Sequence, residues 1–243
     1  MNIKLTIEYD GTKYHGWQVQ PNGETIQEVL EEAIEKMLGV RTRVNGSGRT
    51  DAGVHALGQV ANIIYSGNLD LWQIQRGINA LTPNDIVIKR AEVVPDSFDA
   101  RRGARYRVYQ YRIWNSPWPS VLHRYFSWHV RCPLEISLMQ KSIQFLEGEH
   151  DFASFQGAGC DAAHSVRKIF YNSLSQQGDL LLYTVEATAY LKHMVRNIVG
   201  TMVEIGQRER THTAFAELLR VRDRTKAGPT APPHGLFLME VKY

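Results

Sequence analysis

One carboxylate stands in a short glycine-rich segment of the chain, where a side chain could act on a bound molecule. Within residues 45–61 the sequence places Arg49 and Asp51 two residues apart, among the glycines Gly46, Gly48, Gly53 and Gly58. Glycines let a backbone adopt positive φ angles and approach a ligand closely. An ionised carboxylate can act as a nucleophile, and a nearby guanidinium favours its ionised form. The segment predicts a catalytic loop with Asp51 as its reactive group.

The segment does not fit the known nucleotide-binding motifs. The glycine spacing is not the dinucleotide fingerprint, and no Gly-Lys-Ser/Thr follows it as in a phosphate-binding loop. A plain glycine-rich turn with a surface ion pair remains an alternative at this point. Three further carboxylates, Asp10, Asp99 and Asp151, rank below Asp51 because none has an arginine two residues before it in a glycine-rich setting.

Arginines and tyrosines alternate in the middle of the chain. The segment from Arg101 to Arg112 contains no acidic residue and carries Arg101, Arg102, Arg105, Arg107, Arg112, Tyr106, Tyr109 and Tyr111. Guanidinium groups neutralise phosphates and aromatic rings stack on unpaired bases, so this mixture favours RNA as partner. An edge strand with a solvated arginine face is the alternative.

The composition is that of an ordinary globular protein, with 43% hydrophobic and 22% charged residues and a net charge of +3. No apolar run approaches the roughly 20 residues that cross a bilayer, so we expect no membrane association and a cytoplasmic location. Two cysteines, Cys132 and Cys160, lack metal-ligand spacing, and no His-x-x-x-His pair is present. We therefore expect no metal and no other cofactor.

Apolar periodicity and capping residues predict the elements that must position these side chains. Helices are expected at residues 25–38, 71–81, 133–146, 191–205 and 213–221, and strands at 1–9, 60–65, 86–94, 105–114, 166–175, 180–189 and 236–243. This order predicts an α+β fold of two similar lobes, with mixed, mainly antiparallel sheets flanked by helices and a central cleft. We expect an N-terminal lobe of residues 1–105, carrying the Asp51 loop, and a C-terminal lobe of residues 106–243, carrying the last long helix and the final strand.

Six ordered blocks of the sequence resemble the tRNA pseudouridine synthase A family. The string from Gly48 to Ala56, Gly-Arg-Thr-Asp-Ala-Gly-Val-His-Ala, is similar to its catalytic signature. The remaining blocks are Tyr9-Asp10-Gly11-Thr12-x-Tyr14-x-Gly16-Trp17-Gln18-x-Gln20, Phe98-Asp99-Ala100-Arg101 with Tyr109-x-Tyr111, Gly148-x-His150-Asp151-Phe152-x-Ser154-Phe155, His193-Met194-Val195-Arg196-Asn197-Ile198-Val199-Gly200 and Gly235-Leu236-x-Leu238.

The resemblance implies a pseudouridine synthase fold and a role for each matching residue. Asp51 is the expected catalytic aspartate, Tyr109 the base-stacking tyrosine and Arg196 the basic partner of the aspartate. Arg49 is expected to hold the displaced nucleotide and Leu236 to pack against the target base. Arg101 and Arg107 are further expected contacts to the RNA.

The position of Arg196 follows from its helix. Leu191, Val195, Ile198, Val199 and Met202 are expected to form a buried stripe. His193, Arg196 and Gly200 then share a flanking face, from which an arginine can reach a carboxylate. A solvated arginine whose stem covers the helix is the alternative.

The implied activity is the isomerisation of uridine to pseudouridine in the anticodon stem-loop of tRNAs, at positions 38, 39 and 40, by a homodimer. Two other classes stay open: a nucleoside or glycoside hydrolase that uses Asp51, and a non-catalytic tRNA-binding module. The roles of His55 and of Trp17, Gln18 and Gln20 also stay open, between site and packing.

Overall fold

The computed structural model describes residues 1–243 and divides the chain into two compact units. The first comprises Met1–Arg105 with Phe237–Tyr243, and the second comprises Tyr106–Leu236. The division falls after residue 105, but the final strand, β10 (Leu236–Lys242), runs into the first unit. This corrects its expected place in the C-terminal lobe. The reason is long-range pairing: Phe237 of β10 lies opposite His55 of β3 (His55–Ile64), in parallel register.

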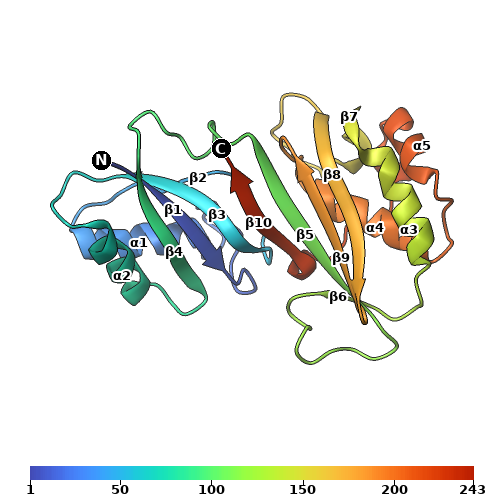
Figure 1. The fold of residues 1–243 in the computed structure, drawn as a ribbon, viewed down its shortest axis with the longest axis horizontal. Coiled ribbons are helices and arrows are strands. Elements are labelled where there is room, and N and C mark those ends of the chain that lie inside the picture. The colour runs from blue at the N-terminus through green and yellow to red at the C-terminus, as the bar shows by residue number, and fades with distance from the viewer. The chain divides into compact units, whose positions relative to one another are not determined.

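The first unit is built on a sheet with the strand order β4-β1-β3-β10 (Figure 1). Strand β1 (Asn2–Tyr9) is antiparallel to both β3 and β4 (Ile86–Val94), and the short β2 (Asn45–Gly46) pairs with β3. Helices α1 (Ile26–Leu38) and α2 (Leu71–Leu81) pack against each other, and α2 also packs on β4. The sheet is therefore mainly antiparallel and flanked by helices.

Local sequence explains these elements. Alternate residues of β1, namely Ile3, Leu5 and Ile7, are fully buried, as period-two patterning requires. Helix α1 is capped by Thr25, whose side chain accepts a hydrogen bond from Glu28 N, and α2 begins with a reciprocal capping box between Asp70 and Gln73.

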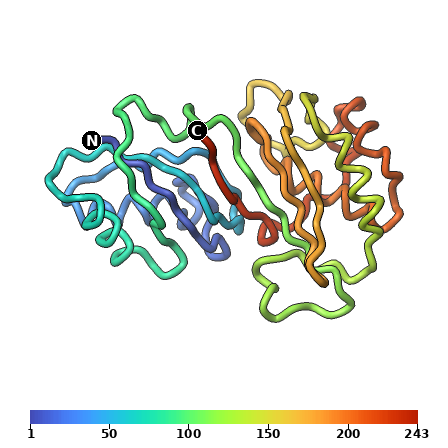
Figure 2. The backbone as a smooth tube through the Cα atoms, viewed as in Figure 1, coloured from blue at the N-terminus to red at the C-terminus, as the bar shows by residue number.

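The second unit contains a sheet with the order β6-β5-β9-β8-β7. Its strands are β5 (Tyr106–Asn115), β6 (Trp128–Val130), β7 (Gly148–Asp151), β8 (Val166–Gln177) and β9 (Leu180–Ala187). All neighbours are antiparallel except β5 and β6. Helices α3 (Ile136–Ile143), α4 (Met194–Gly206) and α5 (Ala214–Val221) flank this sheet (Figure 1). Residues 116–127 connect β5 to β6 as a long loop (Figure 2).

The expected fold class is confirmed as α+β, with mixed sheets flanked by helices. The short strands β2, β6 and β7 were not predicted, because two to four residues carry too little periodicity. Helix α4 begins at Met194 rather than at residue 191, because His193 has a left-handed φ of 60° that an α-helix does not tolerate. No helix of the structure combines the length and apolarity that a membrane span needs.

Candidate active-site residues in the two units

The Asp51 loop joins β2 to β3, and buried polar side chains fix its first half. Ser47 Oγ donates to Gln59 Oε1 at 2.7 Å, and Gln59 Nε2 donates to Gly48 O at 3.0 Å. Ser47 and Gln59 are both buried. Leaving either group unpaired would cost about 1–3 kcal/mol. These bonds therefore hold the backbone that leads into Arg49 in one arrangement.

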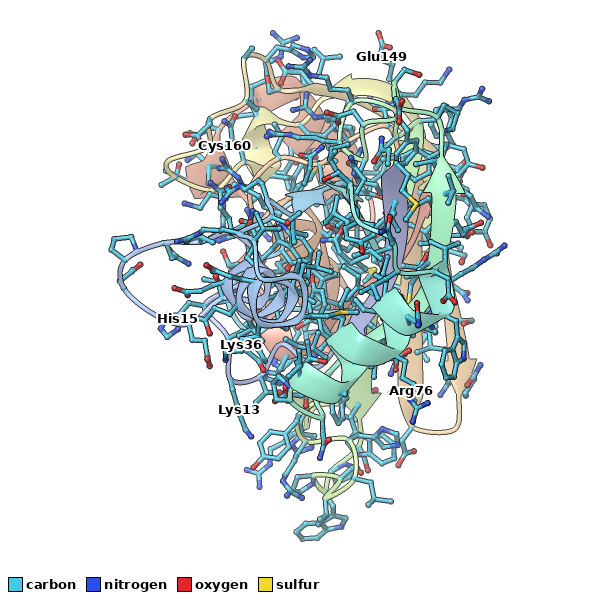
Figure 3. The ribbon with its side chains drawn as sticks, turned by 90° about the vertical axis from the view of Figure 1, so that its left-hand side faces the viewer. Lys13, His15, Lys36, Arg76, Glu149 and Cys160 are labelled. Carbon is cyan, nitrogen blue, oxygen red and sulfur yellow. The ribbon has the colours of Figure 1, made fainter.

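Residues 10–20 wrap around the second half of the same loop. Trp17 N donates to Thr50 O at 3.1 Å, and Gly53 N donates to Tyr14 O at 3.3 Å. Gly16 has a φ of +86°, and a Cβ there would lie 2.5 Å from Thr50 O, so the approach requires glycine. Asp51 thus lies between two backbone anchors. Figure 3 shows Lys13 and His15 at the surface of this wrapping loop, where both are exposed.

Thr50, the residue before Asp51, is tied to the end of β1. Its Oγ1 lies 2.7 Å from the hydroxyl of Tyr9, and both side chains are buried. Tyr9 in turn packs against Trp17, with ring centroids 6.2 Å apart. Trp17 is only 3% exposed, which makes it largely a packing residue, whereas Gln18 and Gln20 are exposed. The central sheet of the first unit therefore positions the backbone of Asp51.

His55 has a packing role at the start of β3. Its ring is 1% exposed and stacks on Phe237 at 4.7 Å. Gly11 N lies 3.0 Å from its Nδ1, and Asp10 Oδ1 lies 3.1 Å from the same nitrogen. Nδ1 thus contacts two residues of the wrapping loop, and the ring packs on β10, so His55 joins that loop to β10.

The three competing carboxylates all serve local structure. Asp10 Oδ1 accepts from the backbone N–H of Thr12 at 3.0 Å. Asp99 accepts from the N–H groups of Arg102 and Arg101, and these bonds hold the pKa of its carboxyl below the ordinary value. Asp151 accepts from Ala153 N and pairs with Arg222 at 3.2 Å. Each of these three carboxylates therefore has a structural role in its own loop.

Arg49 and Arg101 share a small pocket with a third arginine, Arg43. The pocket has a volume of about 140 Å³, and Trp17 and Asn45 are also among its lining residues. All of its walls belong to the first unit. Two of the expected RNA-binding arginines are therefore brought together, beside the loop that carries Asp51.

Tyr109 lies on β5 of the second unit and is 7% exposed. Its ring meets Tyr190 edge to face, with centroids 4.9 Å apart. Tyr190 donates its hydroxyl proton to the carbonyl oxygens of Arg107 and Val185, and burial raises its pKa well above the ordinary value. The Arg107 guanidinium donates to Thr188 O at 3.2 Å. Tyr190 therefore packs against the ring of Tyr109 and binds the backbone of Arg107.

Arg196 lies in the first turn of α4 and is held by the segment of residues 229–231. Its Nε donates to Ala231 O at 2.8 Å, and Ala231 N donates back to Arg196 O at 3.1 Å. Gly200 allows this segment to approach, because a Cβ there would lie 1.7 Å from Pro229 O. The helix is buried over more of its circumference than the predicted stripe, and Gly200 is buried rather than flanking. Because Arg196 Nε is bonded to the protein, the alternative of a fully solvated arginine is wrong.

Leu236 begins β10 and is 6% exposed. The preceding His234 is half-buried, and burial, reinforced by the charge of Arg196, lowers its pKa below the ordinary value. Nearby Tyr111 is fully buried and donates to Pro232 O at 2.7 Å. Tyr111 is therefore a core residue, which removes it from the tyrosines expected to stack on RNA.

The arginine-rich segment is divided between the two units. Arg101, Arg102 and Arg105 belong to the first, and Arg107 and Arg112 to the second. Asp51 and Arg49 likewise lie in the first unit, and Tyr109, Arg196 and Leu236 in the second. A reaction that uses all of the expected residues therefore draws on both units.

Sequence reasoning did not assign roles to several residues that hold these side chains. Tyr9 and Gly200 were part of matching blocks but had no stated function, and Tyr190 and Arg43 were not singled out. Their roles depend on contacts with residues distant in sequence, so the spacing of residues along the chain does not indicate these roles. The one available clue is the acid-free arginine run before Asp51, Arg41-Thr-Arg43 followed by Arg49.

Comparison with known proteins agrees with this arrangement. The family model described as tRNA pseudouridine synthase matches residues 5–101 and 143–243. A tRNA pseudouridine synthase A of Geotalea daltonii is 49% identical over 242 residues, covering 100% of this chain and 99% of that protein. One of Myxococcus xanthus is 47% identical over 244 residues, covering 99% of this chain and 91% of that protein.

These matches, together with the α+β fold and the Asp51 loop, define the class as a pseudouridine synthase, an isomerase. The chain belongs to the tRNA pseudouridine synthase A family.

Proposed function

We propose that this protein isomerises uridine to pseudouridine in tRNA, with Asp51 as its catalytic carboxylate. The observation that carries the proposal is the placement of the signature segment. Its backbone is bonded to Gln59 and Trp17 before Asp51 and to Tyr14 after it. A side chain that must meet a reacting carbon gains from such preorganisation, because misplacement by about 1 Å can cost a factor of 10² in rate.

The reaction breaks the N1–C1′ bond of uridine, turns the freed uracil and forms a C5–C1′ bond. The proton on C5 is lost, and N1 ends protonated, so no water, oxidant or external acceptor is consumed. One ionised carboxylate serves either by attacking C1′ or by removing the C2′ proton. Asp51 supplies that carboxylate.

The second unit supplies the remaining groups in this proposal. Arg196 supplies a guanidinium, a planar group that can donate two charge-assisted hydrogen bonds to a carboxylate. Its orientation is supported by the bond from its Nε to Ala231 O. Tyr109, braced by Tyr190, stacks on the uracil while the base turns. Leu236 forms an apolar wall that keeps water from the intermediate.

The proposed substrate is the anticodon stem-loop, at positions 38, 39 and 40. A uridine in a stem must be flipped out, at a cost of a few kcal/mol. Phosphate contacts from Arg49, Arg101 and Arg107 offset that cost. Recognition at several neighbouring positions implies that the enzyme reads RNA shape rather than base sequence.

Release of tritium from tRNA that contains C5-tritiated uridine tests the proposal. Wild-type protein should release tritium and leave the strand intact, whereas Asp51→Asn should release none and still bind tRNA. Asp179→Asn, in the exposed turn between β8 and β9, is the matched control and should match the wild type. Free uracil as product would show a hydrolase, and an Asp51→Asn variant equal to the wild type would show a site that does not need Asp51.

Tyr109 and Arg196 are tested by graded substitutions. Tyr109→Phe should keep stacking and part of the turnover, whereas Tyr109→Ala should lose both. Arg196→Lys keeps the charge but not the planar group that donates from Nε, so we expect it to lose activity nearly as far as Arg196→Gln. A fully active Tyr109→Ala or Arg196→Gln variant would refute the assigned role.

A homodimer and a cytoplasmic location complete the proposal. The feature that favours self-association is the loop of residues 116–127, which exposes 74% of Trp118 and 84% of Leu122. Apolar side chains exposed together often mark an interface. A Trp118→Ser, Leu122→Ser double variant should become monomeric in sedimentation if this loop forms the interface. An unchanged dimer would place the interface elsewhere.

A further inference from the structure

The pocket that Arg43, Arg49 and Arg101 share has the chemistry of an anion site. Besides these three arginines its lining includes the polar residues Gln18 and Asn45, and it includes no acidic residue. Two acidic residues outside the lining pair with lining residues. Glu31 is buried and accepts from Arg43 at 3.3 Å, and Asp99 accepts from the backbone N–H groups of Arg101 and Arg102 and from the Asn45 side chain. The charged residues of the lining itself are all basic.

The pocket is built rather than incidental. Its Trp17 wall is buried and packs against Gly46, where a Cβ would lie 2.5 Å from the indole ring. Glu31, which orients Arg43, is itself fixed by Gln27 Nε2 at 3.0 Å and Val44 N at 3.1 Å. This buried carboxylate accepts from Nη1 of the Arg43 guanidinium and so orients the group, while 66% of the arginine side chain remains exposed.

The volume of the pocket limits the size of the group that it can bind. Sites that enclose a whole small molecule measure about 300–1,000 Å³, and this pocket measures about 140 Å³. It can take one charged group but not a nucleotide. A phosphate group meets several guanidiniums at once through its oxygens, which makes it the matching anion. Arg49 is two residues from Asp51, a span of at most about 7 Å of chain.

We propose that the pocket of Arg43, Arg49 and Arg101 seats one backbone phosphate of the tRNA, within one or two nucleotides of the uridine on which Asp51 acts. The inference rests on the proposed function and adds Arg43 as a phosphate-binding residue, with Glu31 as its positioning residue. A phosphate held here fixes the register of the strand and carries no sequence information. That role suits an enzyme that accepts several neighbouring uridines.

Salt dependence of tRNA binding tests the inference. Each phosphate contact contributes roughly 0.7–0.9 to the slope of log K against log salt concentration. Arg43→Gln should lower the magnitude of the slope by about that amount. Arg41→Gln is the matched control, because Arg41 is exposed, lies two residues away and does not line the pocket. It should leave the slope unchanged.

Two results would overturn the phosphate pocket. One is an equal slope for the wild type and Arg43→Gln, and the other is an equal decrease of the slope in Arg43→Gln and Arg41→Gln. Inorganic phosphate is the second probe. If it binds the wild type in an Arg43-dependent way while the tRNA slope is unchanged, the pocket takes free anions and the tRNA assignment is wrong. Tritium release by the wild type is measured alongside. Its absence would refute the proposed function, whereas its presence with equal slopes would refute only the pocket.

Discussion

Gly200→Ala is the substitution whose effect the structure defines most sharply. The added Cβ would lie 1.7 Å from Pro229 O, and real Cβ contacts are essentially never closer than 3.0 Å. The segment at residues 229–231 must therefore retreat by about 1.3 Å. Such a shift carries Ala231 beyond hydrogen-bond distance of Arg196, to which it is joined by bonds of 2.8 and 3.1 Å.

The expected loss of stability follows from those two bonds. A neutral backbone bond contributes about 1 kcal/mol, and a bond from a charged guanidinium about 1.5–3 kcal/mol. Alanine in place of glycine returns about 1 kcal/mol of helix propensity. The net change is a loss of about 1.5–3 kcal/mol in the free energy of unfolding. Because Arg196 also loses its fixed acceptor, kcat of the folded variant should fall by about tenfold, with tRNA binding little affected.

Urea unfolding and tritium release measure the two effects, and Gly77→Ala in α2 is the control. At Gly77 the added Cβ would meet the end of the flexible Met37 side chain, 2.5 Å away, which can move aside. Gly77→Ala should therefore be neutral or slightly stabilising. A Gly200→Ala variant within 0.5 kcal/mol of the wild type would refute the account of Arg196, as would full activity of that variant.

Tyr9→Phe leaves buried Thr50 without its 2.7 Å partner, so unfolding should become easier by about 1–3 kcal/mol and kcat should fall; unchanged kcat would separate Thr50 from catalysis. Burial lowers the pKa of His234, so the folded protein binds this proton less readily than the unfolded chain does. Stability should be full above the ordinary pKa of about 6.5 and decline as the pH falls below it, and His234→Gln should flatten that decline in thermal unfolding at several pH values. Asp70→Ala removes the capping box of α2 and should cost about 1 kcal/mol with kcat unchanged, whereas an effect on kcat would point to a role beyond the helix.

Sequence patterns were sufficient for elements whose stability is local. Helix α2 and strand β4 have the predicted bounds, residues 71–81 and 86–94, because their apolar periodicity and end residues lie within the segments themselves. Helix α1 begins at Ile26, one residue later than predicted, and Thr25 is its N-cap. The Asp51 segment could also be singled out, because a carboxylate, an arginine and four glycines are adjacent in the chain. The family resemblance gave the expected roles of Tyr109 and Arg196, which local chemistry alone does not give.

Tertiary structure decided what depends on distant residues. It placed β10 beside β3, gave Thr50 its partner Tyr9, and brought Arg43 and Arg101 to one pocket. It also showed that Gly200 is required by the close approach of Pro229 and not by the helix. Hydrogen-bond partners and close contacts are set by how elements pack, and a residue's own neighbours in the chain do not encode which distant backbone will meet it.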